Sequence, residues 1–421
     1  MARPSVSKTN WQRIRKLFND IHLWLGLTSG LVVLVICFSG TIYVFNTEIT
    51  ENAAPHLYKV APMPGSARIP IDSLIEKVKT YSGGNIISIS IPTDLNRTYQ
   101  FNLKKQGDDS RGGIAYMVNP YTGKITGTSK DKNDTKEFMS TMFSLHRWLL
   151  LDKMEKPIIK DLPNKELGSM ITGSAAILFT IGCITGIIIW FPQRLKNWKQ
   201  GLKVKWTAGW KRTNHDMHSS LAFYAVFFLL LMGLTGPQWS FEWYRNGLQK
   251  SLGTYKPKEA PKEKSLKSTL PGKGTNVASL SIADYLMEAD KTLNYPGNYL
   301  ITLPADSVGA TVISKTKVGF FAPAAPDRIT LDQYNGNVLR IDIFKDKPFN
   351  ERIAGSIKAI HVGNVYGSFT KILYFLACLV ATSLPVTGTM IWINKLGTRG
   401  KRKRNAVIGV EASETGAEQV A

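Results

Sequence analysis

The stretch Asn214-His215-Asp216-Met217-His218 is followed by an apolar run that ends at Gly236. No Asp, Glu, Lys or Arg occurs from Met217 through Phe241. A run of this length crosses a bilayer as one helix, which needs about 20 apolar residues. The sequence therefore predicts a transmembrane helix with histidines at the point where it enters the lipid.

Other parts of the chain have the same character, and four windows in all lack charged residues: Ile21–Thr47, Leu167–Gln193, Met217–Phe241 and Ile372–Asn394. Each is longer than an ordinary buried helix. The first is also too long for a signal-peptide core, and no small-residue cleavage site follows it. We therefore predict a bundle of four transmembrane helices without a cleaved signal.

The chain carries a formal net charge of +22 at pH 7, which is concentrated in three short segments. These segments contain Arg3, Lys8, Arg13, Arg15 and Lys16; Arg194, Lys196, Lys199, Lys203, Lys205, Lys211 and Arg212; and Lys395, Arg399, Lys401, Arg402, Lys403 and Arg404. If four helices cross in alternation, all three segments lie on one side. The positive-inside rule then places both termini in the cytoplasm. This distribution argues against a nucleic-acid partner and indicates that the chain lies in a lipid bilayer.

Two long outer segments, 48–165 and 245–360, have the composition of small α+β modules. In the first, helical spacing at Ile71–Val78 precedes alternating runs and a turn signature at Asn119–Ile125. In the second, Ile282–Leu293 has helical spacing, and Ile329–Leu339 predicts a hairpin around Asn335-Gly336. Two further expectations are an exposed linker from Lys256 to Lys273 and disorder after Lys403.

These patterns divide the whole chain into nine segments. They are a cytoplasmic N-terminus at 1–20, transmembrane helices at 21–47, 167–193, 215–241 and 366–394, outer modules at 48–165 and 245–360, a basic loop at 194–214 and a cytoplasmic tail at 395–421. The three cysteines, Cys37, Cys183 and Cys378, all fall inside transmembrane windows and are interpreted as packing residues. No CxxC or CxxCH occurs, which excludes covalent c-type haem and cysteine-based zinc sites.

The two halves of the chain repeat one pattern, which indicates an internal duplication. His22 precedes Gly40 by eighteen residues, and His218 precedes Gly236 by the same step. The second helix of each half ends in Thr-Gly-x3-Trp, at Thr185–Trp190 and at Thr387–Trp392. An ordered set of matches is a much stronger signal than one motif. The glycines allow close packing of membrane helices, and a flat cofactor among the helices requires the same space.

The predicted topology sorts the six histidines by membrane face. His22, His215 and His218 fall at the inner edge, His146 and His361 fall toward the outer edge, and His56 is expected to be solvated in the outer loop. Eighteen helical residues rise about 27 Å, so a histidine pairs only with one on its own face. The predicted pairs are His22 with His218, and His146 with His361.

Two readings of these pairs stay open at the level of sequence. A single interfacial histidine is usually a hydrogen-bonded cap, whereas paired histidines repeated by duplication favour metal ligands. Zinc or copper sites recruit three or four protein ligands, and only Asp216 lies beside these pairs. Two axial histidines suit a b-type haem, whose porphyrin supplies the other four nitrogens. His215 is an alternative to His218, and Arg147, Arg245 and Lys211 are either propionate partners or ordinary interfacial charges.

Residues 15–395 resemble the PepSY-associated transmembrane-helix proteins, described as iron-regulated membrane proteins. The resemblance rests on Ile21–Gly26, Leu145–Leu149, Asp216–His218, His361–Gly363 and the two Thr-Gly-x3-Trp ends. The outer modules resemble PepSY domains, whose hairpin is similar to Val118–Lys124; the second module departs from it at Asp332–Gly336.

The resemblance implies an inner-membrane reductase of ferric siderophores or similar iron chelates, with two b-type haems. His22 and His218 would ligate the inner haem iron, and His146 and His361 the outer one. An electron donor in the cytoplasm or membrane is also implied, since no GxGxxG fingerprint occurs in this chain. Two alternatives are a PepSY-type binding or regulatory protein without redox activity, and a transporter of haem or metal. No catalytic residue is assigned.

Overall fold

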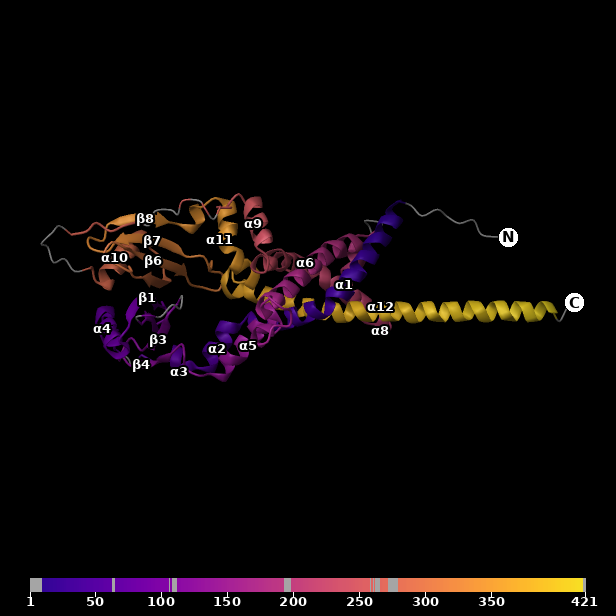
Figure 1. The fold of residues 1–421 in the computed structure, drawn as a ribbon, viewed down its shortest axis with the longest axis horizontal. Helices are drawn as coiled ribbons and strands as arrows, with labels where there is room; N and C mark the ends of the chain where they lie inside the picture. Colours follow the sequence, from indigo (N-terminus) through magenta and orange to yellow (C-terminus); the bar gives the residue numbers. More distant parts are fainter. Residues whose placement is uncertain are drawn as a thin grey trace. The chain divides into compact units, whose positions relative to one another are not determined.

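The protein was analysed as a computed structural model, which describes residues 10–62, 65–105, 107, 112–192, 198–257, 259, 261, 266–271 and 279–418, with side chains from residue 11 to residue 398 of these ranges. Contacts divide the chain into two compact units (Figure 1). The membrane unit comprises Met1–Val44, Thr141–Arg245 and Leu373–Ala421, and the sheet unit comprises Phe45–Ser140 and Asn246–Ile372.

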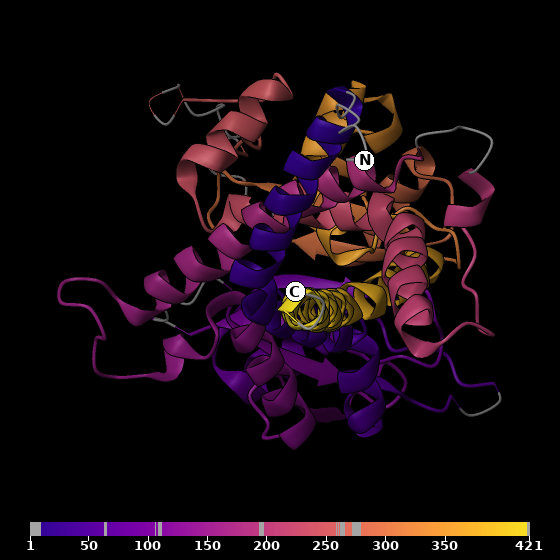
Figure 2. The same ribbon diagram turned by 90° about the vertical axis from the view of Figure 1, so that its right-hand side faces the viewer.

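Four long helices form the membrane unit: α1 (Asn10–Tyr43), α6 (Asn164–Trp190), α8 (Trp210–Thr235) and α12 (Gly367–Glu418). Within the described ranges, these are the helices long and apolar enough to cross a membrane, which confirms the predicted four spans. Shorter helices are α5 (Asp134–Trp148), α7 (Trp198–Gly201) and α9 (Glu242–Ser251), with 3-10 turns η1 (Leu151–Lys153) and η3 (Gly236–Trp239). In Figure 2, α12 is seen nearly end-on and α1 runs obliquely past it.

Small residues bring the membrane helices into close contact. A Cβ added at Gly233 of α8 would lie 2.4 Å from the Oγ1 of Thr180 on α6, so only glycine fits there. A core of Ala225, Leu229, Ala377 and Ala381 joins α8 to α12. Cys37 and Cys183 pack against this core, and the Cys378 Sγ is 3.5 Å from the Sδ of Met232, which also packs against it.

Both ends of the bundle sequence are more helical than we predicted. Helix α1 starts at Asn10 rather than near His22, because residues 10–20 contain neither Pro nor Gly. Helix α12 continues to Glu418, so the expected disorder after Lys403 is wrong; residues 404–418 have no Pro and contain three Ala and three Glu, which favour helices. Arg3, Lys8, Arg194 and Lys196 of the basic segments lie outside the described residues.

The sheet unit is built on one eight-stranded antiparallel sheet, whose strand order is β4-β3-β2-β1-β5-β6-β7-β8. The first module supplies β1 (Asn85–Ile91), β2 (Tyr99–Lys104), β3 (Ile114–Val118) and β4 (Ile125–Thr128); the second supplies β5 (Gly297–Thr302), β6 (Ala310–Lys317), β7 (Asp327–Asp332) and β8 (Val338–Asp342). The modules join through β1 and β5, where Ile89 lies opposite Ile301. The sequence predicted two modules but not this shared sheet.

One hydrophobic core runs through both modules. A row of fully buried side chains crosses neighbouring strands: Phe101, Ile89, Ile301, Ile313 and Ile329. Helices α4 (Ile71–Ser82) and α10 (Ile282–Thr292) contribute buried residues to the same core. Period-two alternation along the strands produces this buried face. The predicted α+β composition of the modules is confirmed.

The two hairpin turns have the same geometry despite different sequences. In the first, the Asn119 Oδ1 accepts the backbone N–H of Tyr121 and Thr122, and Gly123 has φ of 65°. In the second, the Asp332 Oδ1 accepts the N–H of Tyr334 and Asn335, and Gly336 has φ of 72°. A short side-chain acceptor and a left-handed glycine satisfy both turns.

Three features of the sheet unit differ from expectation or were missed. The linker from Lys256 to Lys273 is exposed at most of its described residues, as expected, but Ser268 within it is buried: its hydroxyl donates to the Gly309 carbonyl and accepts the Gln333 N–H. Helix α11 (Phe349–Val362) was not predicted, although Pro348 precedes it and apolar residues recur at helical spacing. Short helices α2 (Asn46–Ala53) and α3 (Pro55–Tyr58) follow α1, and η4 (Phe344–Asp346) precedes α11.

Candidate functional site

His22 on α1 and His218 on α8 face each other inside the membrane unit. Their ring centroids are 6.4 Å apart and their planes are inclined by 85°. His215 differs, since its side chain is 58% exposed and its Nδ1 lies 3.6 Å from the Asp216 carboxylate. Of the two histidines in the opening stretch, the structure brings His218, and not His215, to His22.

Each of the two rings is fixed by the Thr-Gly pair of the neighbouring helix. The His22 Nδ1 is 3.0 Å from both the Gly182 carbonyl oxygen and the Thr185 Oγ1. The His218 Nδ1 is 2.9 Å from the Thr387 Oγ1. The two threonine hydroxyls donate to backbone carbonyls of their own helices, so they accept from histidine. Nδ1 therefore carries the proton in both rings, which leaves Nε2 as the nitrogen available to a metal.

The glycines of the same pairs give the rings their space. A Cβ added at Gly186 would lie 3.3 Å from the His22 Cε1, and one at Gly388 would lie 3.2 Å from the His218 Cε1. From the sequence, these glycines could serve either close helix packing or space for a cofactor. Sequence reasoning missed the role of Thr185 and Thr387, although their repetition beside the glycines was the available signal.

The other polar residues of the opening stretch hold neighbouring segments in place. The Asn214 amide donates to the Thr387 carbonyl on α12. Asp216 is buried, accepts from Arg212 at 2.8 Å and receives the Lys205 N–H at 3.3 Å. The same five-residue stretch therefore positions His218, its threonine partner and the basic loop after α6.

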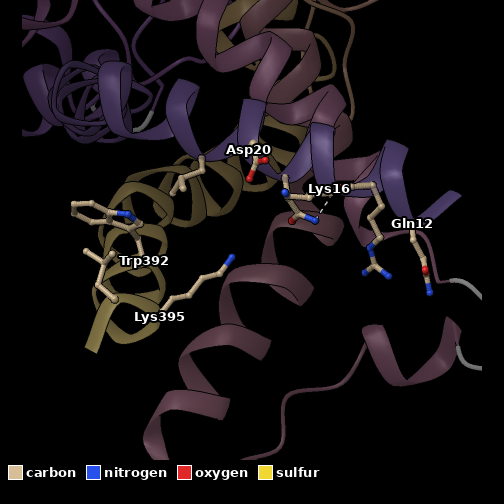
Figure 3. A pocket seen from close by; sticks show the side chains of 9 residues that line it. Gln12, Lys16, Asp20, Trp392 and Lys395 are labelled. Atoms are coloured by element: carbon tan, nitrogen blue, oxygen red, sulfur yellow. Dashed lines mark hydrogen bonds between the residues drawn. The ribbon is translucent and has the colours of Figure 1, made fainter. Parts of the chain in front are cut away.

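A cavity of about 360 Å³ surrounds the paired rings. Its walls are apolar along the helices, and Arg15 and Lys395 lie at its basic end. A second cavity of about 370 Å³ adjoins it and shares both of these cations (Figure 3). Neither cation was among the residues predicted to meet a cofactor's acidic groups.

The sequence matches the family model described as the PepSY-associated TM region over residues 20–395. The chain belongs to this family. A search of curated proteins found no significant match. The family and the four spans together make the chain a multi-pass membrane protein whose helices lie in a lipid bilayer.

In this PepSY-associated membrane protein, His146 on α5 is held in the same manner as the inner pair. Its Nδ1 donates to the Ile36 carbonyl at 2.9 Å. A Cβ added at Gly40 would lie 3.0 Å from the His146 Cε1. Burial lowers the pKa of His146 below its ordinary value, so the ring is neutral, as a ligand must be.

The remaining predicted residues lie in separate places. His361 is half-buried on α11 of the sheet unit, whereas His146 belongs to the membrane unit, and their pairing stays a prediction. His56 is exposed on α3. The Arg147 guanidinium donates to the Trp239 carbonyl, Arg245 lies 3.8 Å from Glu242, and Lys211 is exposed. Among the described residues, no three His, Cys, Asp or Glu side chains converge as a metal site.

Proposed function

We propose that this protein is a b-type haem oxidoreductase of the bacterial inner membrane, which passes electrons outward to ferric iron held in a siderophore or similar chelate. Both termini are proposed to be cytoplasmic, because the described basic residues cluster at the end of the bundle where α1 begins and α12 leaves the predicted span. His22 and His218 would hold one haem, and His146 and His361 a second.

The spacing of His22 and His218 carries the proposal. Imidazole nitrogens bind metals such as zinc at about 2.0–2.1 Å, and a ring centroid lies roughly 1.2 Å behind its nitrogen, so two rings on opposite sides of one metal have centroids about 6.4 Å apart. The observed separation is 6.4 Å. With only two protein ligands, the other positions must come from the cofactor, and a porphyrin supplies four nitrogens.

The residues of this chain would set the chemistry in three ways. Haem bound here supplies one-electron redox chemistry. Thr185 and Thr387 fix the tautomer and angle of their histidines, and such outer partners raise ligand basicity. The helices give the cavity mainly apolar walls, and Arg15 and Lys395 provide positive charge where acidic groups would reach the aqueous side.

An absorption spectrum of the purified, haem-supplied protein, oxidised and then dithionite-reduced, tests this proposal. We expect two b-type haems in the wild-type protein. His22→Ala and His218→Ala should each lose one haem and keep the other, whereas His215→Ala should keep both. Absence of reduced haem bands would favour the binding or regulatory alternative and exclude the reductase. Equal haem loss in His215→Ala would contradict the assignment of His218.

Reduction itself is measured with haem-loaded protein in proteoliposomes. Release of ferrous iron from a ferric hydroxamate chelate, followed with a ferrous-specific dye, should require the donor and the chelate on opposite sides of the membrane. His218→Ala should abolish this release. Uptake of intact haem or chelate without reduction would instead indicate the transporter alternative.

A further inference from the structure

A groove at the basic end of the bundle opens into the histidine cavity. It has a volume of about 370 Å³ and lies between the first turns of α1 and the part of α12 around Trp392 (Figure 3). Lys16 and Asp20 come from α1, and Trp392 and Lys395 come from α12. Trp392, Lys395 and Asp20 also line the histidine cavity. A molecule bound in the groove would therefore lie beside whatever the paired histidines hold.

The corresponding place in the other half of the repeat is filled by the chain itself. Trp190, the counterpart of Trp392, stacks on Phe223 with ring centroids 3.8 Å apart and planes inclined by 17°. Its indole N–H donates to the Gly201 carbonyl of the basic loop. That loop also covers Asp216, the counterpart of Asp20, through the Lys205 N–H.

At the groove, these internal partners are missing from the described part of the chain. Phe223 follows His218 by five residues, and the residue that follows His22 by five is Leu27. No described aromatic ring stacks on Trp392, whose half-buried side chain lines both cavities. The tryptophan therefore occurs in both halves of the repeat. An aromatic ring covers Trp190, and a leucine stands at the equivalent position for Trp392.

The groove is also positively charged. Arg15, Lys16 and Lys395 line it, against one carboxylate, Asp20. Arg15 donates to the Ile189 carbonyl at 3.0 Å and so stays at the boundary of the two cavities. An exposed aromatic face beside several cations suits a planar ring that carries an anionic group.

We propose that this groove binds a reduced flavin mononucleotide as electron donor, with the ring system against Trp392 and the phosphate near Lys16 and Lys395. A site of about 370 Å³ is at the lower end of the range for small-molecule pockets, about 300–1,000 Å³, and fits one ring system rather than a dinucleotide. Oxidation of one dihydroflavin to flavin releases two electrons and two protons. One donor therefore reduces two ferric ions to ferrous, one electron at a time. This redox step rests on the function proposed above.

Binding is tested first, without any need for haem. Oxidised flavin mononucleotide is titrated with the detergent-purified full chain, and fluorescence quenching and anisotropy are followed; riboflavin, which lacks the phosphate, is titrated in parallel. We expect saturable binding of the nucleotide. Trp392→Leu should weaken it by about tenfold, as loss of an aromatic stacking partner does. Lys395→Gln should weaken nucleotide binding about fivefold and leave riboflavin binding unchanged, because it removes a charge partner of the phosphate.

Matched controls lie at the same end of the bundle, outside the groove. Trp206 is 71% exposed and Lys211 is exposed, and neither lines either cavity. Trp206→Leu and Lys211→Gln should bind the nucleotide as the wild type does. Non-saturable binding, or equal affinity in Trp392→Leu, would overturn the proposal. Loss of haem from Lys395→Gln with unchanged nucleotide binding would also overturn it, because the lysine would then serve the haem alone.

The electron-transfer step is tested separately in haem-loaded protein. Under anaerobic conditions, photoreduced flavin mononucleotide should reduce the haem at a rate that saturates with concentration, and Trp392→Leu should remove the saturation. A rate that rises linearly in both proteins would overturn the donor role. If the protein binds the nucleotide but carries no haem, the proposed function is wrong and the proposed nucleotide site is kept. If it carries haem but does not bind the nucleotide, the proposed function is kept and the nucleotide site is wrong.

Discussion

At the scale of single residues, the site depends on groups that are not themselves candidate ligands. The imidazoles of His22 and His218 are held by hydroxyls from Thr185 and Thr387 on the neighbouring helices. A hydroxyl that donates its hydrogen to a carbonyl of its own helix can only accept a hydrogen bond from the histidine. It therefore selects the tautomer with the proton on Nδ1 and no proton on Nε2. The tautomer and the angle of each ring therefore follow from helix packing.

Replacing these hydroxyls should weaken haem binding without leaving a cavity at the helix interface. In Thr387→Val the shape is nearly kept, but the His218 Nδ1 loses its side-chain partner. We expect haem affinity to fall about 10–100-fold, the usual effect of removing an outer partner of a metal-binding histidine. The measurement is a haem titration followed by absorption. Thr398→Val is the control, because the Thr398 hydroxyl donates to the Asn394 carbonyl of its own helix and lines neither cavity; equal losses in both variants would contradict the role of Thr387.

The glycines lead to a second expectation at this scale. Gly186→Ala and Gly388→Ala place a methyl group 3.3 and 3.2 Å from the facing histidine carbons, so each ring must move by a few tenths of an ångström. Functional groups of this kind have to be held within about 0.5 Å of their working geometry. Both variants should therefore shift the haem spectrum and midpoint potential. Gly397→Ala on α12 meets nothing within 4 Å, lines neither cavity and should behave as the wild type.

At the scale of elements, charge-free windows predicted the four spans because no soluble element needs more than 20 apolar residues in a row. Helices α9 and α11 were missed because neither is apolar enough to stand out, and their stability comes from packing rather than propensity. The turn at Asp332 departs in sequence from the PepSY-like hairpin of the first module. It repeats the hydrogen bonds of Asn119, since an aspartate and an asparagine offer the same acceptor at the same distance from the backbone.

Asp332 should make the sheet unit sensitive to acid. Burial alone would raise its pKa, but the backbone N–H groups of Thr269, Tyr334 and Asn335 outweigh burial and hold the pKa below its ordinary value. A carboxylate with a lowered pKa stabilises the fold above its unfolded-state pKa, about 3.9, and this stability is lost as pH falls through the folded-state pKa. Asp332→Asn, which imitates Asn119, should remove that acid dependence.

Thermal unfolding of the full chain at pH 7 and pH 3 measures this effect. Asp332→Ala should lower the free energy of unfolding by about 3 kcal/mol at pH 7, because several buried N–H groups lose their acceptor. Asn119→Ala should show a smaller loss of the same kind with no added acid dependence, since an amide does not titrate. A wild-type protein as stable at pH 3 as at pH 7 would contradict the contribution of Asp332.

At the scale of the whole molecule, the internal repeat could be predicted from the sequence, but the way its two halves pack together could not. The eighteen-residue step paired His22 with His218, and the structure brings those two rings together. The joining of β1 to β5 had no sequence signal, because strand pairing between segments more than 200 residues apart depends on tertiary contacts alone. His146 and His361 belong to different compact units, so the outer pair still rests on the repeat.

The orientation of the chain follows from the same whole-molecule argument and is open to direct test. Cys37, Cys183 and Cys378 are replaced by alanine to give a background without thiols, and single cysteines are then introduced at exposed positions. Tyr81 on α4 is 70% exposed and Met287 on α10 is 60% exposed, both in the sheet unit, whereas Trp206 is in the basic loop.

In spheroplasts, a membrane-impermeant maleimide should label Tyr81→Cys and Met287→Cys at once and Trp206→Cys only after lysis. The physical reason is that Lys and Arg near the ends of short loops are retained on the cytoplasmic side, and the loop between α6 and α8 is rich in both. The thiol-free parent should stay unlabelled. Labelling of Trp206→Cys alone would invert the topology, and different sides for Tyr81 and Met287 would contradict the alternating crossing of four helices. Either result would move the flavin groove to the wrong face for a cytoplasmic donor, so this labelling also decides whether electrons have to travel outward.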